Sequence, residues 1–132
     1  MKIGIIGSRN YENKRKIKEC IYKLKNKCGR ILIASGGSKQ GAEKYAKKYA
    51  LELECEYLEF NPSHTPKNLY SALHENYYGK SYNPGNFFTR NTMLVKYCDM
   101  IIAFVPDGDD GKAITHSLNE AKKYGKKVVI IS

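Results

Sequence analysis

Continuous apolar runs alternate along this chain with segments in which apolar residues recur every three or four positions. The first run, Ile3–Ile6, leads directly into the tight turn Gly7-Ser8-Arg9. Continuous apolar runs are typical of strands buried on both faces, and three-and-four spacing is typical of helices that bury one side. The alternation predicts an α/β chain with an open, mainly parallel, five-stranded sheet covered by helices on both faces.

Five strands are expected, at 3–6, 30–35, 54–60, 100–105 and 127–131, with the third near a sheet edge. Two helical stripes separate the first three strands: Ile17, Cys20, Ile21, Leu24 and Cys28, and then Ala42, Tyr45, Ala46, Tyr49 and Ala50. Further helices are expected over 87–97 and 112–124, and Gly125 suits the left-handed position that ends a helix. The Pro- and Gly-rich segment 61–86 interrupts this rhythm and predicts an irregular loop with a short helix around 69–77.

The length of 132 residues fits a single domain, 1–132, with an aromatic-rich insertion at about 61–86. The net charge of +10 first suggests a nucleic-acid partner. Most of the excess, however, lies on expected helix faces such as 14–18 and 122–127, where basic residues usually form a solvated surface. We therefore rank nucleic acid below a small anionic ligand as the partner of this basic protein.

The four cysteines (20, 28, 55 and 98) show no CxxC spacing and fall mainly in apolar patterns. They are interpreted as reduced, mostly buried thiols of a cytoplasmic protein. The three histidines do not stand at metal-ligand spacings, so no metal site is expected. Neither a secretory leader nor an apolar run of membrane-spanning length is visible, and we expect no membrane contact.

Glycine-rich or basic segments follow several of the expected strands. In a parallel sheet the carboxyl ends of the strands share one edge, where ligands bind. The candidate ligand-binding residues are Gly7, Ser8, Arg9, Ser35, Gly36, Gly37, Ser38, Gly41, Arg90, Asn91, Pro106, Asp107, Gly108, Gly111, Lys112 and Thr115.

The chemistry of these residues suits an anion. A glycine-rich entry into a helix exposes backbone N–H groups at the positive end of the helix dipole, although a plain tight turn would also use a glycine. The spacing is not that of a Walker A loop. Arg9 and Arg90 are the candidates for charge neutralisation, because a guanidinium matches a phosphate bidentately. Surface salt bridges are the alternative role for both arginines.

The segment PDGDDGKAIT (106–115) repeats the glycine-rich entry after the fourth strand. Its three aspartates disfavour a bare phosphate and suit ribose hydroxyls instead, and Asp109 or Asp110 is expected to cap the following helix. Aromatic residues are the candidates for stacking on a base, with packing onto the sheet or a second subunit as the alternative. The stacking candidates are Tyr11, Tyr78, Tyr82 and Phe88.

Together, GSRNY, SGGSKQGAE, YGKSYNPG leading to RN, and CDMIIAFVPDG resemble the motifs of the SLOG superfamily. That superfamily includes the DprA/Smf DNA-processing proteins and the LOG nucleotide phosphoribohydrolases, and the chain is most similar to the small YspA-like branch. The resemblance implies a Rossmann-like domain that binds a nucleotide or a nucleotide-derived ligand. It places Gly7 to Arg9 in the first binding loop and Gly36, Gly37 and Gly41 in the second. It assigns Arg90 and Asn91 to the basic Arg-Asn motif of the family.

The chain departs from LOG enzymes in the last motif. Thr115 stands where the resemblance would place the catalytic glutamate, so hydrolysis of the N-glycosidic bond is in doubt. Weak substitutes are Glu43, which more simply is a helix-dipole partner, and Asp107 or a neighbouring aspartate up to Asp110.

We therefore expect a cytoplasmic protein that senses or sequesters a nucleotide derivative such as an ADP-ribose-like or cyclic nucleotide. We expect it to need no further cofactor. The alternatives are a nucleotide N-glycosidase or phosphoribohydrolase, and a DprA-like single-stranded DNA binder. The resemblance also implies a homo-oligomer, with Tyr45, Tyr49 or the aromatic loop as plausible contacts.

Overall fold

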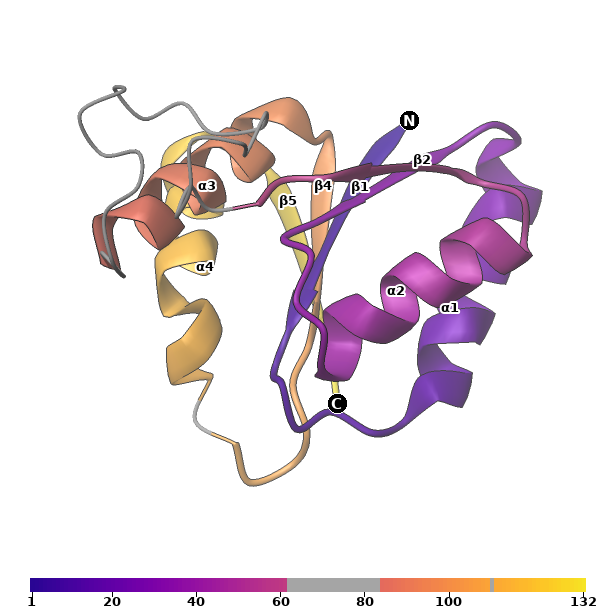
Figure 1. The fold of residues 1–132 in the computed structure, drawn as a ribbon. Helices are drawn as coiled ribbons and strands as arrows, with labels where there is room; N and C mark the ends of the chain where they lie inside the picture. The colour runs from indigo at the N-terminus through magenta and orange to yellow at the C-terminus, as the bar shows by residue number, and fades with distance from the viewer. Residues whose placement is uncertain (62–83, 110) are drawn as a thin grey trace.

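The computed structural model describes residues 1–61, 84–109 and 111–132. Within them lies a five-stranded, all-parallel sheet in the order β3-β2-β1-β4-β5 (Figure 1). The strands are β1 (Lys2–Gly7), β2 (Leu32–Ser35), β3 (Glu56–Glu59), β4 (Met100–Phe104) and β5 (Lys127–Ile131). The predicted α/β architecture is confirmed, with β3 at an edge as expected.

The first strand, β1, lies at the centre of the sheet, and later strands are added on both sides of it. The chain passes from β1 to β2 and β3, then returns to place β4 on the other side of β1. Since parallel crossovers are right-handed, the reversal puts the helices on opposite faces. Helices α1 (Lys14–Cys28) and α2 (Gly41–Glu52) cover one face, and α3 (Pro84–Tyr97) and α4 (Thr115–Lys123) cover the other (Figure 1).

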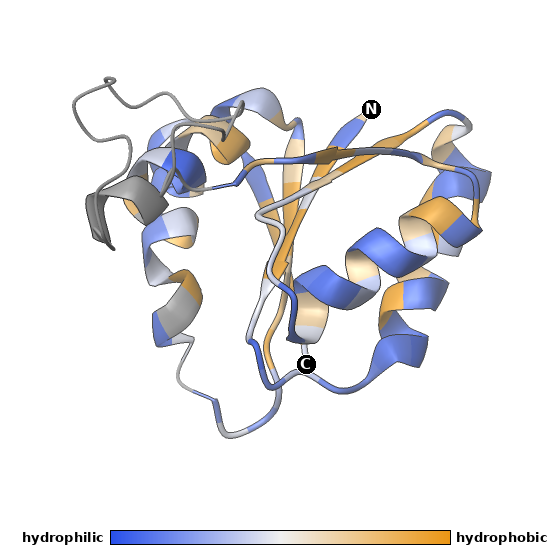
Figure 2. Cartoon of the chain, viewed as in Figure 1, coloured by the Kyte–Doolittle hydropathy of each residue, from blue (hydrophilic) through white to orange (hydrophobic). Residues whose placement is uncertain are grey.

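Alternate residues of the strands supply the two cores between sheet and helices. Ile33 packs in the α1/α2 core, and the next residue, Ala34, lies in the α3/α4 core. In Figure 2 the hydrophobic colour follows the strands and the inner sides of the helices. The helix stripe predicted for α1 is present in part, because Ile17 and Ile21 are fully buried while Cys28 is exposed.

Two helix boundaries differ from the sequence prediction. Helix α3 begins at Pro84, three residues earlier than expected, since proline fits the first helical turn, which needs no N–H partner there. The predicted helix over 112–124 is a short 3-10 helix, η2 (Lys112–Ile114), followed by α4. Gly125, with φ of +67°, follows the end of α4 as predicted.

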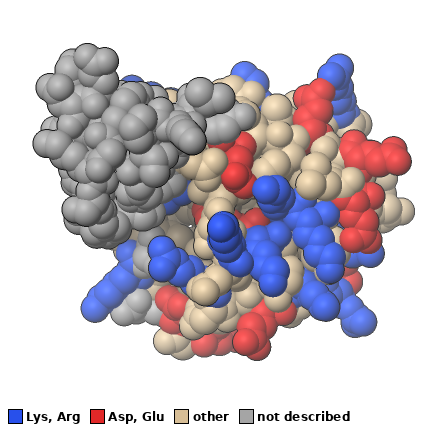
Figure 3. Space-filling view, viewed as in Figure 1, with Lys and Arg blue, Asp and Glu red and all other residues tan. Residues whose placement is uncertain are grey.

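Most of the aromatic-rich insertion, including the expected helix around 69–77, lies outside the described residues. Of the four free cysteines, Cys55 and Cys98 are buried, Cys20 is partly buried and Cys28 is exposed. In the described ranges no helix combines the length and the apolar character needed to cross a bilayer. Lysine and arginine side chains are spread over the α1 and α2 side of the face in Figure 3, with acidic side chains among them.

Candidate functional site

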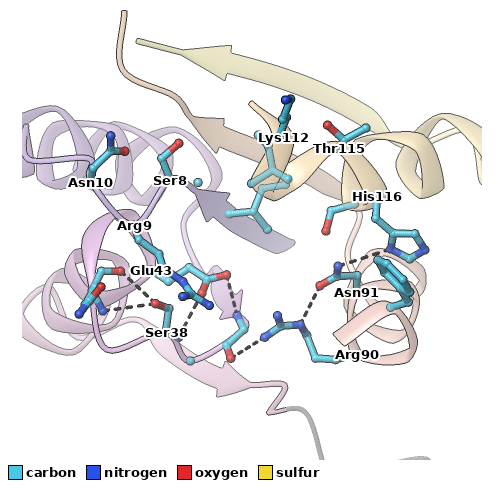
Figure 4. A pocket seen from close by; sticks show the side chains of 18 of the residues that line it. Ser8, Arg9, Asn10, Ser38, Glu43, Arg90, Asn91, Lys112, Thr115 and His116 are labelled. Atoms are coloured by element: carbon cyan, nitrogen blue, oxygen red, sulfur yellow. Dashed lines mark hydrogen bonds between the residues drawn. The ribbon is translucent and has the colours of Figure 1, made fainter. Parts of the chain in front are cut away.

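A pocket of about 1360 Å³ opens at the carboxyl edge of the sheet, at the point where the strand order reverses between β1 and β4. Ligands of open α/β sheets bind at such a reversal. One wall comes from the loops after β1 and β2, and the other from α3, η2 and α4 (Figure 4). The predicted residues that line it are Gly7, Ser8, Arg9, Gly36, Gly37, Ser38, Arg90, Asn91, Lys112 and Thr115, together with Glu43 and Phe88.

Ser8 joins the loop after β1 to the loop after β4. Its hydroxyl is almost fully buried and donates to Asp109 Oδ2 at 2.9 Å. The other oxygen, Asp109 Oδ1, accepts from the backbone N–H of Gly111 at 2.7 Å. The expected helix cap by Asp109 is wrong, because neither η2 nor α4 has a side-chain cap and this carboxylate closes its own turn instead.

Glu43 occupies the backbone donors of the second glycine-rich loop. Its Oε1 accepts from Gly36 N–H at 3.2 Å and its Oε2 from Ser38 N–H at 3.1 Å. Burial raises the pKa of Glu43, while Arg90, these two N–H groups and Arg9 oppose that rise. Two donors predicted to hold a phosphate are therefore already bound to an internal carboxylate.

Arg90 crosses from α3 to the same loop. Its Nη1 donates to the carbonyl oxygens of Gly36 at 2.8 Å and Phe60 at 3.4 Å. Burial lowers the pKa of Arg90, Glu43 opposes that shift and Arg9 adds to it, so the two arginines and the carboxylate form one electrostatic cluster. A Cβ at Gly36 would collide with the Arg90 guanidinium, and this explains the need for glycine at that position.

Gly41 brings the start of α2 against the loop after β1. Its φ is +68°, and an added Cβ would lie 2.6 Å from Arg9 Cα. Its neighbour Ala42 donates its backbone N–H to Ser8 O at 3.3 Å. Gly41 thus acts through close backbone packing rather than by lining the pocket.

Within the second wall, a chain of polar side chains connects α3 to α4. Arg90 Nε donates to Asn91 Oδ1 at 2.7 Å, and Asn91 Nδ2 lies 3.4 Å from His116 Nδ1 (Figure 4). His116 Nε2 lies 3.3 Å from Glu120 Oε1, one helical turn along α4. The ring of Phe88 lies on that of His116, with 4.5 Å between centroids and 42° between planes.

Six predicted binding residues do not line the pocket: Ser35, Gly41, Pro106, Asp107, Gly108 and Gly111. Ser35 is fully buried, and its hydroxyl lies 2.5 Å from Tyr57 Oη and accepts from Gly37 N–H. Asp107 and Gly108 are exposed in the turn after β4. The second catalytic candidate, Asp107, is therefore not among the lining residues, whereas Glu43 is.

The stacking candidates have different positions. Tyr11 is 2% exposed and packs on Phe104 with 5.3 Å between ring centroids, so it is a core residue whose ring is not open to a ligand. Phe88 lines the pocket and is 50% exposed. Tyr78 and Tyr82 lie outside the described residues.

Several lining residues were not among the predicted binding residues: Ile6, Asn10, Lys39, Gln40, Asn61, Asp109, Ile114, His116, Ser117 and Asn119. Lys39 and Gln40 were within reach of sequence reasoning, because they sit in the predicted glycine-rich loop. The sequence offered one indication for His116: it stands four residues before Glu120, a spacing that brings two side chains together on a helix. Among the described residues, no group of three or more His, Cys, Asp or Glu is arranged to hold a metal ion.

Three comparisons bear on this geometry. Residues 1–65 match the model of the YspA, cpYpsA-related SLOG family (YAcAr). No curated protein matches the chain. Among solved structures, the chain is similar to DNA processing protein A from Helicobacter pylori, described for its single-stranded DNA binding mode, with a TM-score of 0.72 and 22% identity.

That likeness covers 98% of this chain and 64% of the Helicobacter protein, and at this identity it shows the fold alone. The matched residues 1–65 contain the loops after β1 and β2, which form the first wall of the pocket. Residues 1–65 of this chain therefore match the YspA, cpYpsA-related SLOG family, within a fold that is shared along nearly the whole chain.

Proposed function

We propose that this protein binds a nucleotide-derived anion in the pocket at the carboxyl edge of the sheet. The observation that carries the proposal is the pair of arginines, Arg9 and Arg90, that interact electrostatically with one Glu43 carboxylate beside this pocket. Among the described residues, this cluster holds two guanidinium groups and one carboxylate. An anion entering the pocket would bring a second negative charge to this cluster.

The remaining charged lining residues support the same conclusion. Lys39 and Lys112 add cationic groups and Asp109 adds an anionic one, so four cationic side chains face two anionic ones in the described lining. The cavity of about 1360 Å³ exceeds the usual size of small-ligand pockets and admits a mononucleotide or a larger derivative.

The ligand would be held by side chains more than by the glycine-loop backbone. Glu43 takes the N–H groups of Gly36 and Ser38, and Asp109 takes the Ser8 hydroxyl and the Gly111 N–H. This internal pairing favours a ligand whose phosphate meets guanidinium and ammonium groups.

Binding without turnover is the better-supported activity. An acid or base catalyst needs a carboxyl oxygen within hydrogen-bond reach of the reacting group. Both oxygens of Glu43 accept backbone hydrogen bonds, and Asp107 stands outside the lining. Release of free base from AMP, followed by chromatography, would favour the N-glycosidase alternative.

The test is calorimetric titration with AMP, cyclic AMP and ADP-ribose, and with a single-stranded oligothymidylate. We expect saturable one-to-one binding of at least one nucleotide. Arg9→Ala should weaken it about 10- to 100-fold, the loss typical of a charged hydrogen-bonding partner. Arg15→Ala removes an equal charge from the exposed surface of α1, outside the pocket, and should leave affinity unchanged.

Two outcomes would overturn the proposal. One is no nucleotide binding at millimolar concentration. The other is tight oligothymidylate binding that falls steeply with salt and weakens equally in both arginine variants, since that pattern marks a diffuse nucleic-acid surface.

A further inference from the structure

The two ends of the pocket differ in chemistry. Arg9 and Lys39 come from the loops after β1 and β2 and supply cationic groups, and Arg90 extends from α3 to the Gly36 carbonyl in the loop after β2. Lys112 of η2 is a fourth cationic lining residue. Phe88 and His116 come from α3 and α4 and place two aromatic rings at the opposite wall. A ligand with one anionic end and one aromatic end would be oriented by this difference.

Phe88 is suited to contact a ligand. Large apolar side chains in a soluble protein are mostly buried, yet this ring is 50% exposed and lines the cavity. The ring also contacts the imidazole of His116, with 4.5 Å between the ring centroids and 42° between the ring planes. The two rings form a small aromatic surface, which we call the Phe88/His116 platform.

The hydrogen-bond network fixes the orientation of the His116 ring. A guanidinium only donates, so Arg90 Nε requires the carbonyl oxygen of Asn91 to face it, and the Asn91 NH₂ group then faces His116. His116 Nδ1 therefore accepts, and its proton resides on Nε2, toward Glu120. Both nitrogens of the imidazole therefore face side chains of the protein, so a base would meet the ring through a face and not through a nitrogen.

We infer that the Phe88/His116 platform is a nucleobase subsite, so that the base stacks there while the phosphate lies toward Arg9. The inference rests on the proposed function and makes it more specific, because it requires a heteroaromatic base and not only a sugar phosphate. Asn91 and Glu120 are positioning residues in this account, because they hold His116.

The experiment compares AMP with ribose 5-phosphate, which lacks the base, by calorimetry on the wild type and three variants. Phe88→Leu keeps an apolar side chain but removes the ring, and should weaken AMP binding about tenfold or more while leaving ribose 5-phosphate unchanged. Arg9→Ala should weaken both ligands. Tyr22→Ala, which removes an exposed ring from α1, is the control and should affect neither.

A second readout on the wild type does not depend on any variant folding. Stacking places the base ring current over His116, so AMP should shift the carbon-bound proton resonances of this imidazole and ribose 5-phosphate should not. Equal effects of Phe88→Leu on both ligands, or identical imidazole shifts with both, would overturn the base subsite while leaving the anion site intact. Failure of the wild type to bind either probe would overturn both.

Discussion

Replacing Glu43 with glutamine should affect stability and anion binding in opposite directions. The carboxylate satisfies two backbone donors, Gly36 N–H and Ser38 N–H, through its two oxygens. An amide has one acceptor oxygen, so one donor is left facing an NH₂ group. An unpaired donor of this kind costs about 1–3 kcal/mol of unfolding free energy, partly offset because a buried charge is removed.

The same change removes the negative charge between Arg9 and Arg90. For an anion about 8 Å away, that charge is worth about 0.5 kcal/mol in a water-like dielectric and about 2 kcal/mol at an effective dielectric of 20. AMP affinity should therefore rise about two- to thirty-fold even though the protein is less stable. A purely structural role for Glu43 would lower both quantities together.

Urea unfolding and calorimetry on Glu43→Gln measure the two effects. The unfolding midpoint should fall with an unchanged slope, and Glu19→Gln on the exposed face of α1 should change neither quantity. A variant as stable as the wild type would show that removal of the buried charge offsets the lost hydrogen bond in full, and would refute the predicted loss of stability. A variant with weaker anion binding would refute the electrostatic argument.

Further predictions concern pH, packing, thiols and tautomers. Burial raises the pKa of Glu43, so the protonated carboxyl stabilises the folded state. This contribution to the free energy of unfolding should be lost as pH rises from about 4.5 through the raised pKa. Urea unfolding at several pH values should show the loss in the wild type but not in Glu43→Gln. Gly36→Ala should displace Arg90, weaken AMP binding about tenfold and lower the free energy of unfolding by about 1–3 kcal/mol. Calorimetry and urea unfolding measure the two effects, and unchanged AMP affinity would contradict the assigned position of Arg90. Burial raises the pKa of Cys98 to about 12, so a thiol reagent should modify exposed Cys28 first and Cys98 only on unfolding, and early labelling of Cys98 would contradict this order. Nitrogen-15 shifts at pH 8 should identify the Nε2–H tautomer of His116, and an Nδ1–H signal would contradict the network.

The fold was predictable because each of its elements has a local signature. Buried strands such as β1 and β4 are continuous apolar runs, and the stripe of α2 shows its helical period directly. The starts of α3 and α4 were less certain, since Pro84 and Lys112 each suit more than one local conformation.

Only the parts of the site that follow directly from neighbouring residues in the sequence could be predicted. Ser8, Arg9 and the glycine loop were identified because they follow strands that share one edge. The pairing of Asn91 with His116 joins residues 25 positions apart across two helices, and no local pattern specifies such a contact. Glu43 shows an intermediate case: its first-turn position indicated a helix-dipole role, but its bonds to Gly36 and Ser38 depend on how the loop folds back.

The central claim is that an anion derived from a nucleotide binds at the reversal of the strand order. The most direct test is a titration of the isotope-labelled protein with AMP, followed through its backbone amide resonances. We predict saturable shifts confined to pocket residues, including Arg9, Gly36, Asn91 and His116. Shifts spread over the exposed lysines of α1, or none at millimolar AMP, would contradict the account.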